Sequence, residues 1–131
     1  MASVLIVDDD STVRDLLERF VRFAGHDAAS VQDARAALAA MATVPPPIVV
    51  LCDVHLQDGP DGLWLADRIR ELYPTTAMIL ATGDATVPPT ESLRKGVVGY
   101  LVKPFRHAEV ARAVTNGVRW SKMESVKRGG R

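Results

Sequence analysis

Aspartates stand at the ends of two apolar runs in this sequence. Residues 4–7 are all apolar and lead into three consecutive aspartates, residues 8–10, and the apolar run over residues 48–52 ends at Asp53. Carboxylates that act without histidine or cysteine partners form an oxygen ligand set, which suits Mg²⁺ or Mn²⁺ and does not suit zinc. A carboxylate can also serve as a nucleophile and accept a phosphoryl group. The pattern therefore points to metal-assisted phosphoryl chemistry.

A structural explanation of the three aspartates competes with the metal site. One of them could cap the helix that follows while the others lie in water, because aspartate is a preferred N-cap residue. Ser11 is a fair N-cap by the same rule. Both explanations stay open until the ends of the other apolar runs are considered.

Two more polar residues, Thr82 and Lys103, follow apolar runs in the same way. An ammonium group neutralises phosphoryl oxygens, and a threonine hydroxyl donates a hydrogen bond to one of them. Such fixed groups stabilise the charge of phosphoryl transfer. The sequence contains neither G-x-x-x-x-G-K-[ST] nor G-x-G-x-x-G. The predicted site therefore accepts a single phosphoryl group and not a nucleotide.

Apolar runs and helical spacing alternate along the chain. Short apolar runs predict buried strands, and apolar residues three and four apart predict one face of a helix. Strands are predicted over residues 4–7, 27–31, 48–52, 77–81 and 97–102. Helices are predicted over about 11–24, 33–41, 62–73, 88–95 and 106–123. This alternation with short connections predicts a parallel sheet with helices on both faces.

The carboxyl ends of the strands locate the site, because open α/β sheets bind ligands at that edge. By this rule the aspartates at residues 8–10, Asp53, Thr82 and Lys103 all come to one edge. A lone aspartate after a strand is usually a turn residue, and a lone lysine is usually a solvated surface group. Their joint placement favours a functional site over those separate explanations.

Composition is that of an ordinary globular domain. The 131 residues fit one domain, with 47% hydrophobic and 24% charged residues. No apolar run approaches the roughly 20 residues of a membrane span, and we expect no leader sequence before the first strand. Cys52 is the single cysteine, so no internal disulfide can form. We expect a cytoplasmic protein that does not associate with membranes.

Charge is balanced overall but divided along the chain. Residues 1–119 contain twelve Lys/Arg and fifteen Asp/Glu, a net charge of −3, whereas residues 120–131 have a net charge of +3. The acidic body argues against a nucleic-acid surface. The basic segment, residues 120–131, is expected to be the end of the last helix with a basic tail or the start of a linker, although it could contact a polyanion.

The motifs at the strand ends resemble those of bacterial response-regulator receiver domains over about residues 3–119. Four of them occur in order and spacing, and three further pairs match typical positions: Val7-Asp8-Asp9, Asp53, Thr82, Lys103-Pro104-Phe105, Asp61-Gly62, Lys95-Gly96 and Gly99-Tyr100. The resemblance implies a flavodoxin-like, doubly wound (βα)5 sandwich with five parallel strands in the order 2-1-3-4-5. It also implies a receiver domain over residues 1–119.

The resemblance implies a role for each acid. Asp53 would accept a phosphoryl group from a sensor histidine kinase or a phosphotransfer protein. Asp9 would bind Mg²⁺ directly, with Mn²⁺ as a substitute, and Asp8 would assist, often through water. His55 would offer its backbone carbonyl to the metal. Asp10 is not a family ligand, so it is better explained as a solvated or capping acid.

The resemblance also implies a switch. Thr82 and Lys103 would contact the phosphoryl oxygens. Tyr100 would turn inward as Thr82 moves, which would remodel the face made by the fourth helix, the fifth strand and the last helix. The bond before Pro104 is expected to be cis, a form that only X-Pro bonds adopt at low cost. The domain would be a switch with self-catalysed phosphoryl transfer and hydrolysis, not a metabolic enzyme.

The loop after Asp53 departs from the family pattern. The family commonly has proline where this chain has Gln57, and the stretch over residues 56–62 is one residue longer than usual. His55 and Asp84 occupy positions that tune phosphoryl lifetime in the family, and we expect them to position or exclude the hydrolytic water. The fourth helix is weak because it starts with two prolines and has few apolar residues.

Two other functions compete with the phosphorylation switch. An interaction-only receiver would keep the fold without using phosphate, but it would have lost an acid, the threonine or the lysine. An aspartate-nucleophile phosphatase would have its acids spaced D-x-D on the first strand, whereas Asp8 and Asp9 are adjacent. The downstream effector is not identified by these residues, since no segment predicts a DNA-binding or catalytic output domain.

Overall fold

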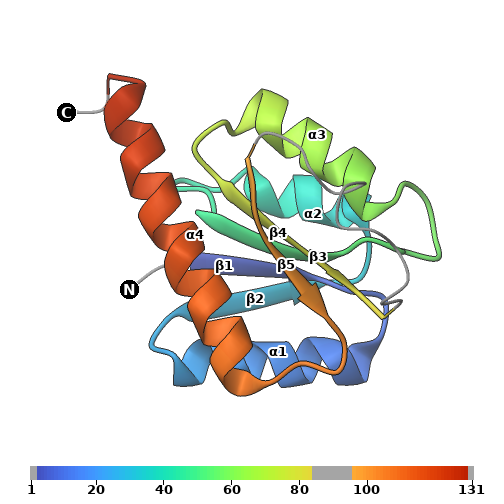
Figure 1. The fold of residues 1–131 in the computed structure, drawn as a ribbon. Helices are drawn as coiled ribbons and strands as arrows, with labels where there is room; N and C mark the ends of the chain where they lie inside the picture. The colour runs from blue at the N-terminus through green and yellow to red at the C-terminus, as the bar shows by residue number, and fades with distance from the viewer. Residues whose placement is uncertain (1–2, 84–95, 130–131) are drawn as a thin grey trace.

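A five-stranded parallel sheet forms the middle of three layers (Figure 1). The computed structural model describes residues 3–83 and 96–129. The strand order is β2-β1-β3-β4-β5, as expected for a flavodoxin-like fold. The strands are β1 (Ser3–Val7), β2 (Asp27–Val31), β3 (Val49–Asp53), β4 (Ala77–Thr82) and β5 (Val97–Val102). The central strands β3 and β4 are buried over their whole length, which explains why their sequences are continuous apolar runs.

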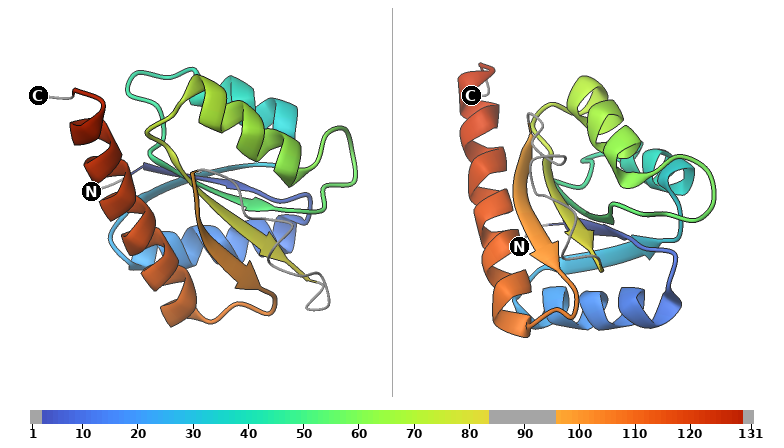
Figure 2. Two further views of the ribbon diagram at one scale, coloured as in Figure 1. Left: turned by 45° about the horizontal axis from the view of Figure 1, so that its top comes forward. Right: turned by 45° about the vertical axis from the view of Figure 1, so that its right-hand side comes forward.

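Helices pack on both faces of the sheet (Figure 2). The described helices are α1 (Ser11–Phe23), α2 (Ala34–Met41), α3 (Gly62–Leu72) and α4 (His107–Lys127). Successive residues of each strand alternate between two cores. Leu5 and Val50 lie in the core beneath α2 and α3, whereas Val4 and Val49 lie in the core beneath α1 and α4. The predicted helix over residues 88–95 lies outside the described residues.

The boundaries differ from prediction in a few places. Ser11 is not the N-cap of α1. The N-cap is Asp10, whose side chain accepts hydrogen bonds from the backbone N–H groups of Thr12 and Val13. The apolar runs end at residues 52 and 81, and the strands β3 and β4 each continue for one more residue, since Asp53 and Thr82 pair within the sheet. These small shifts make Asp53 and Thr82 the last residues of their strands.

The last helix is longer than predicted. It continues from His107 to Lys127, four residues beyond the expected end at residue 123. The buried hydroxyl of Ser121 donates to the backbone carbonyl of Thr75 and ties this part of α4 to the turn before β4. Among the described residues, no helix is both long enough and apolar enough to cross a membrane.

Candidate functional site

The site residues lie at the carboxyl edge of the sheet. Asp8 directly follows β1, Asp53 ends β3, Thr82 ends β4, and Lys103 directly follows β5. Backbone hydrogen bonds between neighbouring strands continue past the strand ends. The Lys103 N–H donates to the Thr82 carbonyl at 2.8 Å, and the Val54 N–H donates to the Ala81 carbonyl at 2.8 Å. The sheet itself therefore holds these positions side by side.

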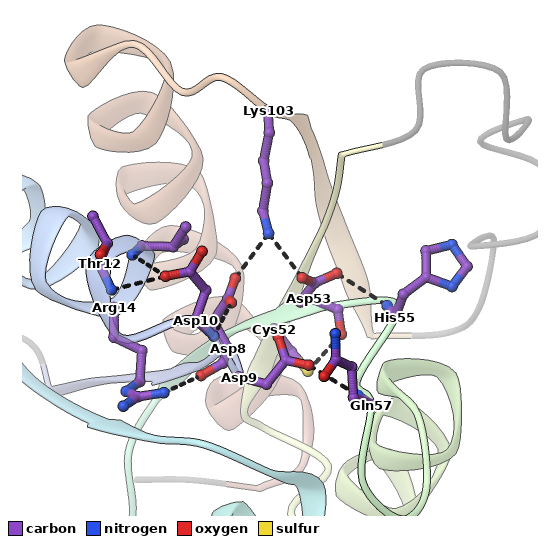
Figure 3. A network of polar contacts seen from close by, with 11 residues as sticks. Asp8, Asp9, Asp10, Thr12, Arg14, Cys52, Asp53, His55, Gln57 and Lys103 are labelled. Atoms are coloured by element: carbon purple, nitrogen blue, oxygen red, sulfur yellow. Dashed lines mark hydrogen bonds and ion pairs between the residues drawn. The ribbon is translucent and has the colours of Figure 1, made fainter.

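Lys103 bridges two of the aspartates (Figure 3). Its Nζ atom lies 2.8 Å from Oδ2 of Asp53 and 3.0 Å from Oδ2 of Asp8. Both aspartates are buried, with 1% of Asp8 and 6% of Asp53 exposed. Since buried charges require partners, the lysine is part of what allows two carboxylates to coexist at this edge.

Burial and pairing act in opposite directions on these groups. Removal from water raises the pKa of Asp8, and the hydrogen bonds from the Asp10 N–H and Lys103 do not fully offset that effect. Burial would lower the pKa of Lys103, but hydrogen bonds and attraction to Asp53 and Asp8 outweigh it and raise that pKa. Lys103 is the more exposed of the partners, so attraction dominates there and desolvation dominates at Asp8. Lys103 is therefore firmly protonated beside the acids.

Three carboxylates converge on one point. Asp8, Asp9 and Asp53 each place an oxygen so that these atoms all lie within 4.8 Å of one another. One ammonium group does not balance three carboxylates, which leaves negative charge that a divalent cation would neutralise. The convergent side chains supply only oxygen atoms, and such a set fits Mg²⁺ or Mn²⁺.

The Asp10 side chain takes no part in this cluster. Its Oδ1 atom accepts hydrogen bonds from the backbone N–H groups of Thr12 at 2.9 Å and Val13 at 3.4 Å. The prediction that Asp10 is a solvated or capping acid is confirmed. Arg14, one turn into α1, donates to the backbone carbonyl of Asp8 at 2.7 Å and holds the turn between β1 and α1 (Figure 3).

The loop after Asp53 also contacts the carboxylates. The His55 N–H donates to Oδ1 of Asp53 at 3.0 Å, and the Gln57 N–H donates to Oδ2 of Asp9 at 2.9 Å. The imidazole of His55 points away from the cluster (Figure 3). Sequence reasoning missed the contact from Gln57, because every residue except proline carries a backbone N–H. The absence of proline at this position was the signal that could have indicated it.

The residues predicted to form the switch lie around this edge. Thr82 is fully buried, and Tyr100 is half-buried against the core beneath α2 and α3. Tyr100 is paired with Leu80 across β4 and β5, two residues before Thr82. The Lys103–Pro104 bond is cis. Asp84 lies outside the described residues, so its predicted role in phosphoryl lifetime stays a prediction.

Neutralising Asp8 is expected to stabilise the protein when no divalent cation is present. The pKa of Asp8 is higher in the folded protein than in the unfolded chain. Ionisation of Asp8 therefore destabilises the folded protein increasingly as the pH rises from the lower to the higher of these two pKa values. The full loss of stability persists at higher pH. At pH 7 we expect Asp8→Asn to increase the free energy of unfolding by on the order of 1 kcal/mol. Urea unfolding in EDTA measures the gain, which should shrink as the pH falls toward 4. A variant less stable than wild type at pH 7 would contradict this account.

Similar proteins show the same domain. The family model of the response regulator receiver domain matches residues 4–115. The response regulator FleR of Pseudomonas aeruginosa is 37% identical over 105 residues, which are 79% of this chain and 22% of that protein. The DNA-binding transcriptional regulator NtrC of Salmonella typhimurium is 33% identical over 116 residues, which are 88% of this chain and 24% of that protein. The chain thus spans about a quarter of the length of these curated relatives.

Solved structures agree with the sequence relatives. NtrX from Brucella abortus in complex with ADP superposes with a TM-score of 0.89 at 28% identity, covering 99% of this chain and 30% of that one. A CheY-like response regulator receiver domain protein from Methanospirillum hungatei superposes with a TM-score of 0.84 at 25% identity, covering 95% of this chain and 98% of that one. With the family match and the cluster at the strand ends, this chain belongs to the response regulator receiver domain family of two-component systems.

Proposed function

We propose that this chain is a phospho-accepting receiver in which Asp53 takes a phosphoryl group from a sensor histidine kinase or a phosphotransfer protein. The observation that carries the proposal is the Lys103 ammonium, 2.8 Å from Asp53 and 3.0 Å from Asp8, beside three convergent carboxylates. Asp8, Asp9, Asp53 and the backbone carbonyl of His55 would hold Mg²⁺, or Mn²⁺ in its place.

The chemistry is an in-line displacement at phosphorus. A carboxylate oxygen of Asp53 attacks the phosphorus of a phosphohistidine, the P–O bond forms, and the P–N bond breaks as the imidazole leaves. Bound Mg²⁺ would neutralise charge on the phosphoryl oxygens. Lys103 shifts from the Asp53 carboxylate toward a phosphoryl oxygen, and the Thr82 hydroxyl donates to another. Later attack by water on the phosphorus breaks the P–O bond to Asp53, releases inorganic phosphate and regenerates the carboxylate. In this proposal the domain is a switch and not a metabolic enzyme.

An apolar groove beside Lys103 supports docking of a protein donor. It is lined by Val13 and Leu16 of α1 and by Pro104 and Phe105 after β5, and it has a volume of about 380 Å³. Lys103 also lines it, so a helix seated there would present its phosphohistidine close to the carboxylates. We propose that the domain binds neither nucleic acid, which the net negative charge of residues 1–119 disfavours, nor a membrane, and that this signalling step takes place in the cytoplasm.

The conformational change would be transmitted from Thr82 to the surface formed by β5 and its surroundings. Thr82 is buried at the end of β4, and Tyr100 lies on the neighbouring strand. Movement of Thr82 toward the phosphoryl group would open room for the Tyr100 ring and alter the surface of β5 and the helices beside it. A downstream effector domain or protein would read this surface, and the DNA-binding regulators among the relatives make a transcriptional output one candidate.

Incubation with acetyl phosphate and Mg²⁺ tests the proposal. We expect intact-protein mass spectrometry to show one phosphoryl adduct that is stable in acid and labile in base, as acyl phosphates are. Addition of EDTA before acetyl phosphate should prevent its formation. Absence of an adduct on wild-type protein, with Mg²⁺ present and the fold intact, would favour the interaction-only receiver.

Lys103 should matter for the rate of phosphorylation. Lys103→Met removes the positive charge but keeps a side chain of similar length, and we expect the initial rate with acetyl phosphate to fall about 100-fold, the usual cost of losing one electrostatic donor. Lys103→Arg is the matched control, because it keeps the charge but not the compact ammonium geometry, and it should retain a larger part of the rate. Equal rates for wild type and Lys103→Met would remove the lysine from the mechanism.

A further inference from the structure

The loop over residues 54–61 is fastened at two places. At its base, the Gly62 N–H donates to the Val54 carbonyl at 2.9 Å, and the side chains of Val54 and Leu56 are buried in the core beneath α2 and α3. Farther along, the Gln57 N–H donates to Oδ2 of Asp9 at 2.9 Å, across 48 positions of sequence. The Gln57 side chain itself is exposed. The loop therefore meets the carboxylate cluster through a backbone amide.

The carboxylate of Asp9 is held by fewer hydrogen bonds than those of Asp8 and Asp53. Asp8 is oriented by the Asp10 N–H at 2.9 Å and by Lys103 at 3.0 Å. Asp53 is oriented by Lys103 at 2.8 Å and by the His55 N–H at 3.0 Å. Among the described residues, Asp9 has a single hydrogen bond to its carboxylate, the one from Gln57, and it is also the most exposed of the three acids.

We propose that the backbone amide of Gln57 is a positioning group that orients Asp9 for a divalent cation and thereby couples the loop over residues 54–61 to cation binding. The inference rests on the proposed function, because it concerns the same cation site. A carboxylate has two oxygens, so the bond to Oδ2 leaves Oδ1 available for the cation. Groups that hydrogen-bond to metal ligands typically change affinity 10- to 100-fold when they are removed.

The coupling operates in both directions. If the amide helps Asp9 bind the cation, the bound cation must by linkage strengthen the contact between Asp9 and Gln57. The loop should therefore become more protected when the cation binds. The loop ends with Asp61, which is the N-cap of α3, so the increased protection would extend to the start of that helix. Cation occupancy would thus be visible on a surface outside the carboxylate cluster.

Two substitutions at one position separate the amide from the side chain. Gln57→Pro removes the N–H, whereas Gln57→Ala keeps the N–H and removes the polar side chain. Titration of each protein with MgCl₂, followed by NMR amide shifts, gives the dissociation constant without any phosphoryl donor. We expect the constant to rise about 10-fold in Gln57→Pro and to stay within about twofold of wild type in Gln57→Ala. Thermal unfolding in EDTA checks that both variants are folded.

Hydrogen exchange on the wild-type protein provides a test that no folding defect can obscure. We expect the Gln57 amide to exchange more slowly than an open loop amide, and more slowly still in MgCl₂. Unchanged exchange in MgCl₂, or wild-type Mg²⁺ affinity in a folded Gln57→Pro protein, would overturn the inference and leave the proposed function standing. Failure of wild-type protein to bind Mg²⁺ at all would overturn both.

Discussion

Asp53→Asn is expected to abolish the phosphoryl adduct that acetyl phosphate forms in the presence of Mg²⁺. The amide of asparagine is neutral and cannot supply the carboxylate oxygen that attacks phosphorus, although it has nearly the same shape. Asp53 is 6% exposed and bonded to Lys103 and to the His55 N–H, so the substitution changes charge without opening a cavity. Mass spectrometry after incubation with acetyl phosphate should detect no adduct on the variant.

Asp10, the third of the consecutive aspartates, provides a matched control outside the carboxylate cluster. Asp10→Asn makes the same chemical change two residues from Asp8, but Asp10 caps α1 and makes no ion pair with Lys103. Asparagine caps helices as well as aspartate does, so this variant should form the adduct at a rate close to that of wild type. An adduct that persists on Asp53→Asn and maps to another residue would show that Asp53 is not the acceptor.

Gly62→Ala is expected to destabilise the protein by about 3 kcal/mol or more, beyond the usual cost of overpacking. A Cβ atom at Gly62 would lie 2.4 Å from the backbone oxygen of Asp53 and 2.9 Å from the Cα atom of Val54. Both obstacles are backbone atoms at the end of β3, and they cannot move without displacing Asp53. Urea unfolding should therefore show a large loss of stability together with weakened Mg²⁺ binding.

Gly83→Ala provides the comparison for that loss. Among the described residues, its added Cβ would meet only the side chain of Lys103, at an ordinary 3.8 Å, so the stability change should be within about 0.5 kcal/mol. If Gly62→Ala unfolds at the same urea concentration as wild type, the close approach of α3 to the end of β3 does not determine stability. A Gly62→Ala protein that is destabilised yet binds Mg²⁺ normally would show that the packing at Gly62 supports stability but does not affect the cation site.

Much of the fold and of the acidic cluster could be predicted from the sequence, because parallel strands that are buried on both faces have continuous apolar sequences. The runs before Asp8 and Asp53 predicted the strands within about one residue, and the parallel arrangement then brought both acids to one edge. Lys103 was predicted there for the same reason, and its two ion pairs place it within the cluster. The metal and phosphoryl roles of these residues stay predictions that the proposed experiments test.

Other features depend on contacts that local sequence does not encode. Asp10 and Ser11 are both good caps, and the choice between them depends on where the backbone becomes helical, which is after the extended Asp10. The hydrogen bond from the Ser121 hydroxyl to the Thr75 carbonyl is a tertiary contact that periodicity does not predict, and α4 continues beyond it to Lys127. The bond from Gln57 to Asp9 joins backbone to side chain across 48 positions, and only the folded chain shows it.

The position of Cys52 makes it an intrinsic reporter of transient unfolding. Its thiol is fully buried on the opposite side of β3 from the Asp53 side chain, and burial raises the pKa of that thiol well above its ordinary value. A thiol reagent can therefore modify it only in molecules whose core has opened. Where the core closes faster than the reagent reacts, the labelling rate measures the fraction of molecules in which the core beneath α2 and α3 has opened. Anything that binds the folded site should slow that rate in proportion to its own affinity.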